Sequence, residues 1–237
     1  MCALVERKPG VVTGARLTSL LLPAQLQSAC GAENSPENRL SKPALAYCWA
    51  MSSSAISTGA TGASEANVGT VVASLLVASN GATSLRGGSR GLRTAEDRER
   101  FLALRNGPDI AAILVGGASA ATEPYARAPH PLIVFSRSDE LATFPGATMV
   151  SGPVPSIPEF IAQLRRKFTN TILCEGGVEL IHLLLADELI DSFFISRVTA
   201  TGDGHFLDEN LLRSKMTLIS TETFNQTTFE RYERASR

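Results

Sequence analysis

Short runs of apolar residues alternate along the chain with segments whose apolar positions recur at helical spacing. The runs are bounded by glycine, proline, serine or asparagine and predict buried strands at residues 70–79 (TVVASLLVAS), 109–117 (DIAAILVGG), 131–137 (PLIVFSR), 171–175 (TILCE) and 191–200 (DSFFISRVTA). The intervening segments predict helices at 93–107, 156–168 and 178–188. This alternation predicts a three-layer α/β fold, with a mostly parallel sheet between two layers of helices.

The ends of the predicted helices carry recognisable capping residues. Thr94 is placed to cap the first helix, and Gly107 with Pro108 ends it. Ser156 and Glu159 have the spacing of a capping box at the start of the second. Near the C-terminus, residues 216–233 read as two strands joined by a turn at Asn225, which predicts an antiparallel hairpin.

The first part of the chain lacks this rhythm. Residues 31–69 are rich in Ser, Gly, Ala and Asn and predict loop or linker. Residues 17–30 (LTSLLLPAQLQSAC) superficially resemble a secretion signal, but the apolar run is short and Pro23 and Gln25 interrupt it, so we interpret it as a surface helix. We therefore expect an N-terminal extension over 1–69, partly helical and partly linker, and one ordered domain over 70–237.

The amino-acid composition indicates what kind of protein this is and which partners to expect. The chain is 44% hydrophobic and 19% charged, as expected of a globular protein with a real core. Its net charge of −1 gives no reason to expect nucleic acid or a membrane as partner. The four cysteines are scattered, and the three histidines have no partner at metal-binding or catalytic-triad spacing, so we expect a cytoplasmic protein without a metal site.

Polar and glycine residues gather where the predicted strands end, at 79–81 (SNG), 116–119 (GGAS), 136–137 (SR) and 175–177 (EGG). In open α/β sheets, ligands bind beyond the carboxyl ends of the strands. Glycines there let phosphate groups approach the backbone at a helix N-terminus, although each pair could equally serve only a tight turn. Neither GxGxxG nor GxxxxGK[ST] is present, so a standard dinucleotide fingerprint and a P-loop are both excluded.

Residues 87–125 (GGSRGLRTAEDRERFLALRNGPDIAAILVGGASAATEPY), followed by 172–191 (ILCEGGVELIHLLLADELID), resemble the C-terminal reductase domain of the riboflavin-biosynthesis deaminase–reductase. More specifically, the chain is similar to stand-alone pyrimidine reductase-like proteins, which have a dihydrofolate-reductase-like fold. The likeness covers about residues 70–237, and the zinc motifs of the family's deaminase domain are absent.

The resemblance implies an NADPH-dependent reductase that opens the ribosyl ring of 5-amino-6-(5-phosphoribosylamino)uracil by hydride delivery to C1′. It further implies a homodimer. The cofactor residues it implies are Gly116, Gly117, Ser119, Ser136, Arg137, Gly176, Gly177, Val178 and Leu180, with Ser136 and Arg137 at the adenosine 2′-phosphate. The substrate residues it implies are Ser79, Asn80, Ser89, Arg98 and Glu175, of which Glu175 positions the substrate for catalysis.

One departure from the family pattern bears on the substrate. The family's first strand commonly ends Ser-Leu-Asp-Gly, whereas this strand ends at Ser79, Asn80 and Gly81, without the acid. Two alternatives therefore stay open. One is a reductase of pterins or other heterocycles, disfavoured because dihydrofolate reductases carry an acid in the early active-site helix, where Ser89 and the arginines of residues 93–105 resemble a phosphoribosyl-binding pattern instead. The other is a catalytically silent NADP(H)-binding protein.

Overall fold

The computed structural model describes residues 68–123, 125, 128–136, 146–150 and 156–235 of the 237-residue chain. The extension predicted over residues 1–69, with its helix at 17–30, lies almost wholly outside the described residues, as does Arg137. The first described residue is Val68, and the first strand begins three residues later.

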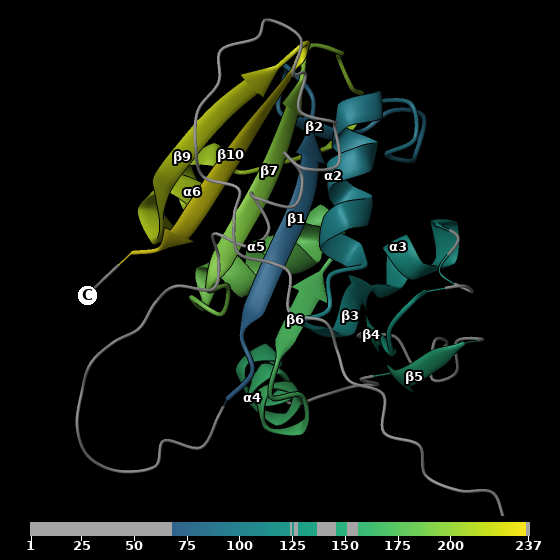
Figure 1. Ribbon diagram of the computed structural model, residues 1–237, viewed down its shortest axis with the longest axis vertical. Coiled ribbons are helices and arrows are strands. Elements are labelled where there is room, and N and C mark those ends of the chain that lie inside the picture. The colour runs from purple at the N-terminus through teal and green to yellow at the C-terminus, as the bar shows by residue number, and fades with distance from the viewer. Residues whose placement is uncertain (1–67, 124, 126–127, 137–145, 151–155, 236–237) are drawn as a thin grey trace, which may run out of the picture. The chain divides into compact units, whose positions relative to one another are not determined.

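The described chain is built on an eight-stranded sheet with the order β5-β4-β3-β6-β1-β7-β10-β9 (Figure 1). Its strands are β1 (Val71–Val77), β3 (Ile110–Gly116), β4 (Leu132–Phe135), β5 (Ala147–Val150), β6 (Thr171–Cys174), β7 (Ser192–Val198), β9 (Met216–Phe224) and β10 (Thr227–Arg234). Every neighbouring pair from β5 to β7 is parallel, and only β10 runs against the other strands. The mostly parallel sheet and the terminal antiparallel hairpin are thus confirmed.

Helices cover both faces of this sheet. The elements are α2 (Ala95–Arg105), α3 (Gly117–Thr122), α4 (Ile157–Lys167), α5 (Val178–Ala186) and α6 (Glu209–Lys215). Apolar side chains of α4, α5 and α6 pack on one face, and those of α2 and α3 lie against the other (Figure 1). The three-layer architecture follows from this arrangement.

Successive side chains of a strand point to opposite faces of the sheet, so the sheet has a hydrophobic core on each face. In β3, Ala112 and Leu114 join the core under α4 and α5, whereas Ile113 and Val115 face the opposite layer. These four side chains are fully buried, because both faces of a parallel strand are covered by helices. Among the described helices, none combines the length and apolar character needed to cross a membrane.

The predicted caps form as expected. The Thr94 hydroxyl accepts a hydrogen bond from the Asp97 backbone N–H at 3.1 Å, and Ser156 accepts one from Glu159 N–H at 3.4 Å. The sequence pattern did not predict α3, β5 and α6, nor a small ribbon in which β2 (Ala82–Ser84) pairs antiparallel with β8 (Gly204–Phe206). These elements have three to seven residues each, too few to develop a recognisable period.

Candidate active site

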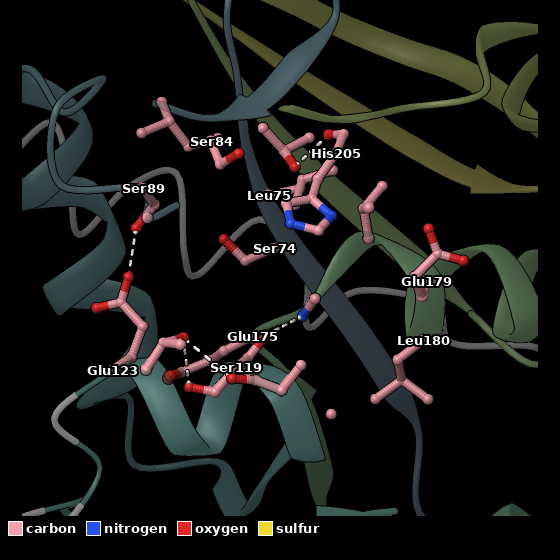
Figure 2. Close-up of a pocket in the computed structure, with 18 of the residues that line it drawn as sticks. Ser74, Leu75, Ser84, Ser89, Ser119, Glu123, Glu175, Glu179, Leu180 and His205 are labelled. Carbon is pink, nitrogen blue, oxygen red and sulfur yellow. Dashed lines mark hydrogen bonds between the residues drawn. The ribbon is translucent and has the colours of Figure 1, made fainter. Parts of the chain in front are cut away.

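A cavity of about 890 Å³ opens where β1, β3 and β6 end (Figure 2). Its walls come from β1, the start of α2, the β3–α3 and β6–α5 turns, and the β2–β8 ribbon. The position agrees with the expectation that ligands bind beyond the carboxyl ends of parallel strands. Its volume lies in the range of ligand-binding pockets.

Most residues predicted to hold a cofactor lie together along one side of this cavity. Those that line it are Gly116, Gly117, Ser119, Ser136, Gly177, Val178 and Leu180. Gly176 does not line the cavity but forms the turn behind it, with a φ of 98° that favours glycine. Arg137 directly follows Ser136 in the chain and falls outside the described residues.

The two glycine turns are joined by two hydrogen bonds. The Gly177 backbone N–H donates to Ser119 Oγ at 2.9 Å, and the Gly116 N–H donates to Gly176 O at 2.9 Å. A Cβ on Gly177 would lie only 2.7 Å from Ser119 Oγ, so a larger residue would displace the Ser119 side chain and disturb this hydrogen bond. The Ser119 hydroxyl still has its own hydrogen to donate to a ligand.

Glu175 lies at the bottom of the cavity with its side chain only 1% exposed. The Arg105 Nε lies 3.2 Å from its Oε1, but neither carboxylate oxygen has a partner in hydrogen-bond geometry among the described residues. The pair is therefore held by charge, without a formed hydrogen bond. Burial raises the pKa of the Glu175 carboxyl to about 7, while Arg105, Tyr125 and Arg93 act in the opposite direction.

One face of α2 and the residues just before it supply a polar stripe along the cavity. Arg93, Asp97, Phe101 and Arg105 are spaced by four and therefore share a helix face. Arg93, Asp97 and Phe101 line the cavity. Arg105 reaches Glu175, and its guanidinium lies 5.6 Å from the Phe101 ring centroid.

Asp97 is the buried acid of this stripe, with 7% of its surface exposed. Burial raises the pKa of its carboxyl above the ordinary value, and a hydrogen bond with Ser196 and the charges of Arg93 and Arg100 partly offset that effect. From the sequence it looked like an ordinary first-turn acid. Asp97, in the first turn of α2, therefore also faces the cavity.

Ser89, Arg93 and Glu123 form a cluster at the wall opposite α5 (Figure 2). The Ser89 hydroxyl donates to Glu123 Oε1 at 3.0 Å, and Arg93 Nη2 donates to Ser89 Oγ at 2.8 Å. Arg93 also forms an ion pair with Glu123 Oε2 at 3.4 Å. The predicted substrate residue Ser89 therefore lies at the cavity beside two charged residues that the sequence did not single out.

Three other predicted substrate residues do not line the cavity. Ser79 donates its hydroxyl to Ala200 O at 3.1 Å, and the Asn80 amide bonds both main-chain groups of Gly202. Both side chains thus tie the end of β1 to the loop after β7. Arg98 is exposed on α2, whereas Arg93, one turn earlier, faces the cavity.

Several cavity residues were missed at the sequence level, among them Ser74, Thr83, Tyr125 and His205. The four-residue spacing of the α2 stripe could have revealed Arg93, Asp97 and Arg105. Thr83 and His205 lie on the β2–β8 ribbon, whose strands are separated by more than a hundred residues. No local pattern could have brought those two together.

No protein-family model matches this sequence, and no curated protein sequence matches it. Solved structures do match. One is a diaminohydroxyphosphoribosylaminopyrimidine deaminase/5-amino-6-(5-phosphoribosylamino)uracil reductase from Thermotoga maritima, with a TM-score of 0.56 and 16% identity over 71% of this chain. The match spans 57% of the length of that two-activity protein.

Two further solved structures match over nearly their full length. A dihydrofolate reductase from Enterococcus faecalis complexed with NADP(H) has a TM-score of 0.54 and 16% identity, covering 70% of this chain and 97% of that one. A protein from Shewanella sp. PV-4 described as a riboflavin biosynthesis protein has a TM-score of 0.56 and 18% identity, covering 70% and 99%. The chain thus resembles pyrimidine and dihydrofolate reductases in structure, and its fold is the dihydrofolate-reductase-like α/β fold.

Proposed function

We propose that the protein is an NADPH-dependent reductase of the pyrimidine reductase type. Its substrate would be 5-amino-6-(5-phosphoribosylamino)uracil or a close relative, reduced at the ribosyl C1′. The fold supports a reductase, since the matching structures include a uracil reductase and an NADP(H)-bound dihydrofolate reductase. The cavity supports two adjacent ligands, because glycine turns and helix ends form one wall and side-chain hydrogen-bonding groups form the other.

The observation that carries the proposal is the Glu175–Arg105 pair. Both Glu175 oxygens and the Arg105 Nε and Nη2 are buried without a hydrogen-bond partner among the described residues. Buried polar groups in proteins are nearly always hydrogen-bonded, and Glu175, although paired with Arg105, keeps oxygen lone pairs that a ligand in the cavity could use. Glu175 lines the cavity, and a carboxylate acceptor there suits the N–H groups of a heterocycle such as uracil.

The opposite wall supports the cofactor. Helix α5 begins at Val178 with Gly177 as its N-cap, and backbone N–H groups at a helix start favour phosphate. When bound, NADPH would supply the hydride, and the chain would orient its nicotinamide against the reacting carbon. From the resemblance, we expect Ser136 and Arg137 to meet the 2′-phosphate, the usual way in which an arginine selects NADP.

The test is direct. Purified protein is incubated with NADPH and 5-amino-6-(5-phosphoribosylamino)uracil, and NADPH loss is followed together with formation of the ribityl product. Turnover that needs both compounds is the expected result. Tight NADPH binding without turnover on any heterocycle would instead indicate a silent NADP(H)-binding protein.

Asp97 favours a second candidate function, reduction of a pterin or a related heterocycle. The sequence-based objection was that residues 93–105 lack the acid of dihydrofolate reductases, but Asp97 in α2 is buried and lines the cavity. That objection was wrong. Dihydrofolate belongs in the same assay, and turnover of dihydrofolate with an inert ribosylaminouracil would select this alternative.

A further inference from the structure

His205 has an uncommon backbone conformation. Its φ is 56°, in the left-handed region that non-glycine residues seldom occupy, although histidine enters it more often than most. The Thr83 hydroxyl donates to the His205 carbonyl oxygen at 2.5 Å, and β2 pairs with β8 on both sides of it. In this conformation the imidazole faces the cavity (Figure 2).

The imidazole is one of the groups that line the cavity. Figure 2 shows it above Ser74 and Leu75 of β1, with Ser84 on one side and Glu179 on the other. For His205 to act in the proposed reaction, hydride transfer would take place beneath this imidazole.

The charge of the imidazole depends on few neighbours. The adjacent strands β1 and β2 carry no titratable side chain. On α5, Glu179 lines the cavity, and on its own loop Asp203 accepts the Arg86 N–H through both oxygens at 2.9 Å. His205 is itself exposed, so solvent can return a proton to it after each turnover.

We propose that His205 is a catalytic residue, the proton donor for the reduction. The inference rests on the proposed function. The C=N carbon of the ring-opened ribosylamine receives a hydride with its electron pair, which leaves NADP⁺. The electron pair of the C=N π bond moves to nitrogen, which takes the proton of the imidazolium and leaves neutral imidazole. Solvent then reprotonates His205, and the net reaction consumes one hydride and one proton.

The other acidic groups at the cavity are less suited to this step. Glu175 is held under Arg105 at the bottom, and Glu123 is engaged by Ser89 and Arg93. Asp97 is buried and engaged by Ser196. Burial raises the pKa of the Tyr125 hydroxyl far above neutral pH. Of these groups only His205 is exposed to solvent, and histidine is the side chain that most often serves as a general acid.

The backbone of His205 makes a clean experiment possible. Asparagine and glycine both tolerate a positive φ, so His205→Asn and His205→Gly should fold normally. We expect kcat to fall about 100-fold in both variants with NADPH affinity unchanged, because a general acid contributes at least that much. Wild-type kcat should fall as pH rises and the imidazolium loses its proton, and the variants should lack this fall, whereas any pH dependence that arises from Glu175 is common to all three proteins. Added imidazole should restore activity to His205→Gly and not to His205→Asn.

Phe206→Asn is the matched control, because Phe206 is exposed on the same strand and does not line the cavity. Full kcat and an unchanged pH profile in His205→Asn would overturn the role of His205 and leave the proposed function standing. A lowered kcat with the wild-type pH profile and no imidazole rescue would reduce His205 to a structural residue. A wild-type protein without reductase activity on any C=N or C=O substrate would overturn both.

Discussion

At the residue scale, Glu175 couples the stability of the protein to pH. Burial raises its pKa from the ordinary 4.5 to about 7, so between these values the folded protein binds more protons than the unfolded chain. The free energy of unfolding should therefore fall as pH rises through that window, by roughly 3 kcal/mol for this group. Urea denaturation at a series of pH values measures the slope.

Glu175→Gln is the comparison, because glutamine has nearly the same volume and does not titrate. The variant should lose this part of the slope and match or exceed the wild type in stability at the upper end of the window. Asp97 remains in both proteins, so its own raised pKa affects both curves alike. Parallel curves for wild type and variant would contradict the raised pKa of Glu175.

The same substitution tests the binding role of Glu175. Above its pKa the carboxylate would accept a charge-assisted hydrogen bond from the heterocycle, and glutamine would replace it with a weaker neutral bond. Substrate affinity should fall by about 1–3 kcal/mol, while NADPH affinity should stay the same. Calorimetric titration of both ligands gives the two values.

Glu179→Gln is the matched control for charge, since Glu179 also lines the cavity but on the first turn of α5. Its substitution should leave substrate affinity unchanged. If Glu175→Gln binds substrate as tightly as the wild type does, the role of Glu175 is structural, as the ion-pair partner of Arg105.

At the element scale, the β2–β8 ribbon depends on Asn80. The Asn80 Nδ2 donates to Gly202 O at 2.9 Å, and its Oδ1 accepts from Gly202 N–H at 3.2 Å, so one amide holds both main-chain groups of the loop. Aspartate, which the resembling family carries here, cannot donate and would place a carboxylate against the carbonyl oxygen. Asn80→Asp should therefore cost about 1 kcal/mol and fail to increase activity.

Hydrogen exchange of the amides of residues 82–84 and 204–206 should speed up in Asn80→Asp, because the ribbon opens more often. Asn210 is exposed on α6, so Asn210→Asp makes the same charge change away from the ribbon and should leave that exchange unaltered. Higher turnover in Asn80→Asp with an intact ribbon would show instead that the missing acid belongs to the active site.

The helices and strands also show which parts of the structure the sequence predicts and which parts it does not. Long apolar runs and capped helices predicted the sheet, its helices and the hairpin, because burial on both faces of a strand leaves a clear pattern over five or more residues. The glycine turns and Glu175 were predicted from the ends of those same strands. Arg93 and Asp97 were missed because charged residues at a helix start already have a local explanation. His205 was assigned no role because β8 pairs with a strand more than a hundred residues earlier.

At the scale of the whole molecule, the sheet ends in an open edge. β9 is the last strand in the order, pairs only with β10 among the described strands, and exposes Leu218, Ile219 and Phe224 at 48%, 55% and 42%. It is nine residues long, contains no proline or lysine, and has one charged residue, Glu222. Natural edge strands usually carry charges or proline to prevent pairing, and β9 has almost none of this protection.

We therefore predict a homodimer in which β9 contributes to the contact between two copies related by a twofold axis. Each copy should keep its own cavity, because the described walls come from within one chain. Light scattering should give twice the mass of the chain at tens of micromolar, about the range that a micromolar interface requires.

Ile219→Lys should shift the protein to monomer without altering NADPH affinity, because a lysine on the strand edge opposes pairing. Asn210→Lys adds the same charge on α6 and should leave the dimer intact. A wild-type monomer at that concentration would contradict the prediction, and a dimer that survives Ile219→Lys would move the contact away from β9.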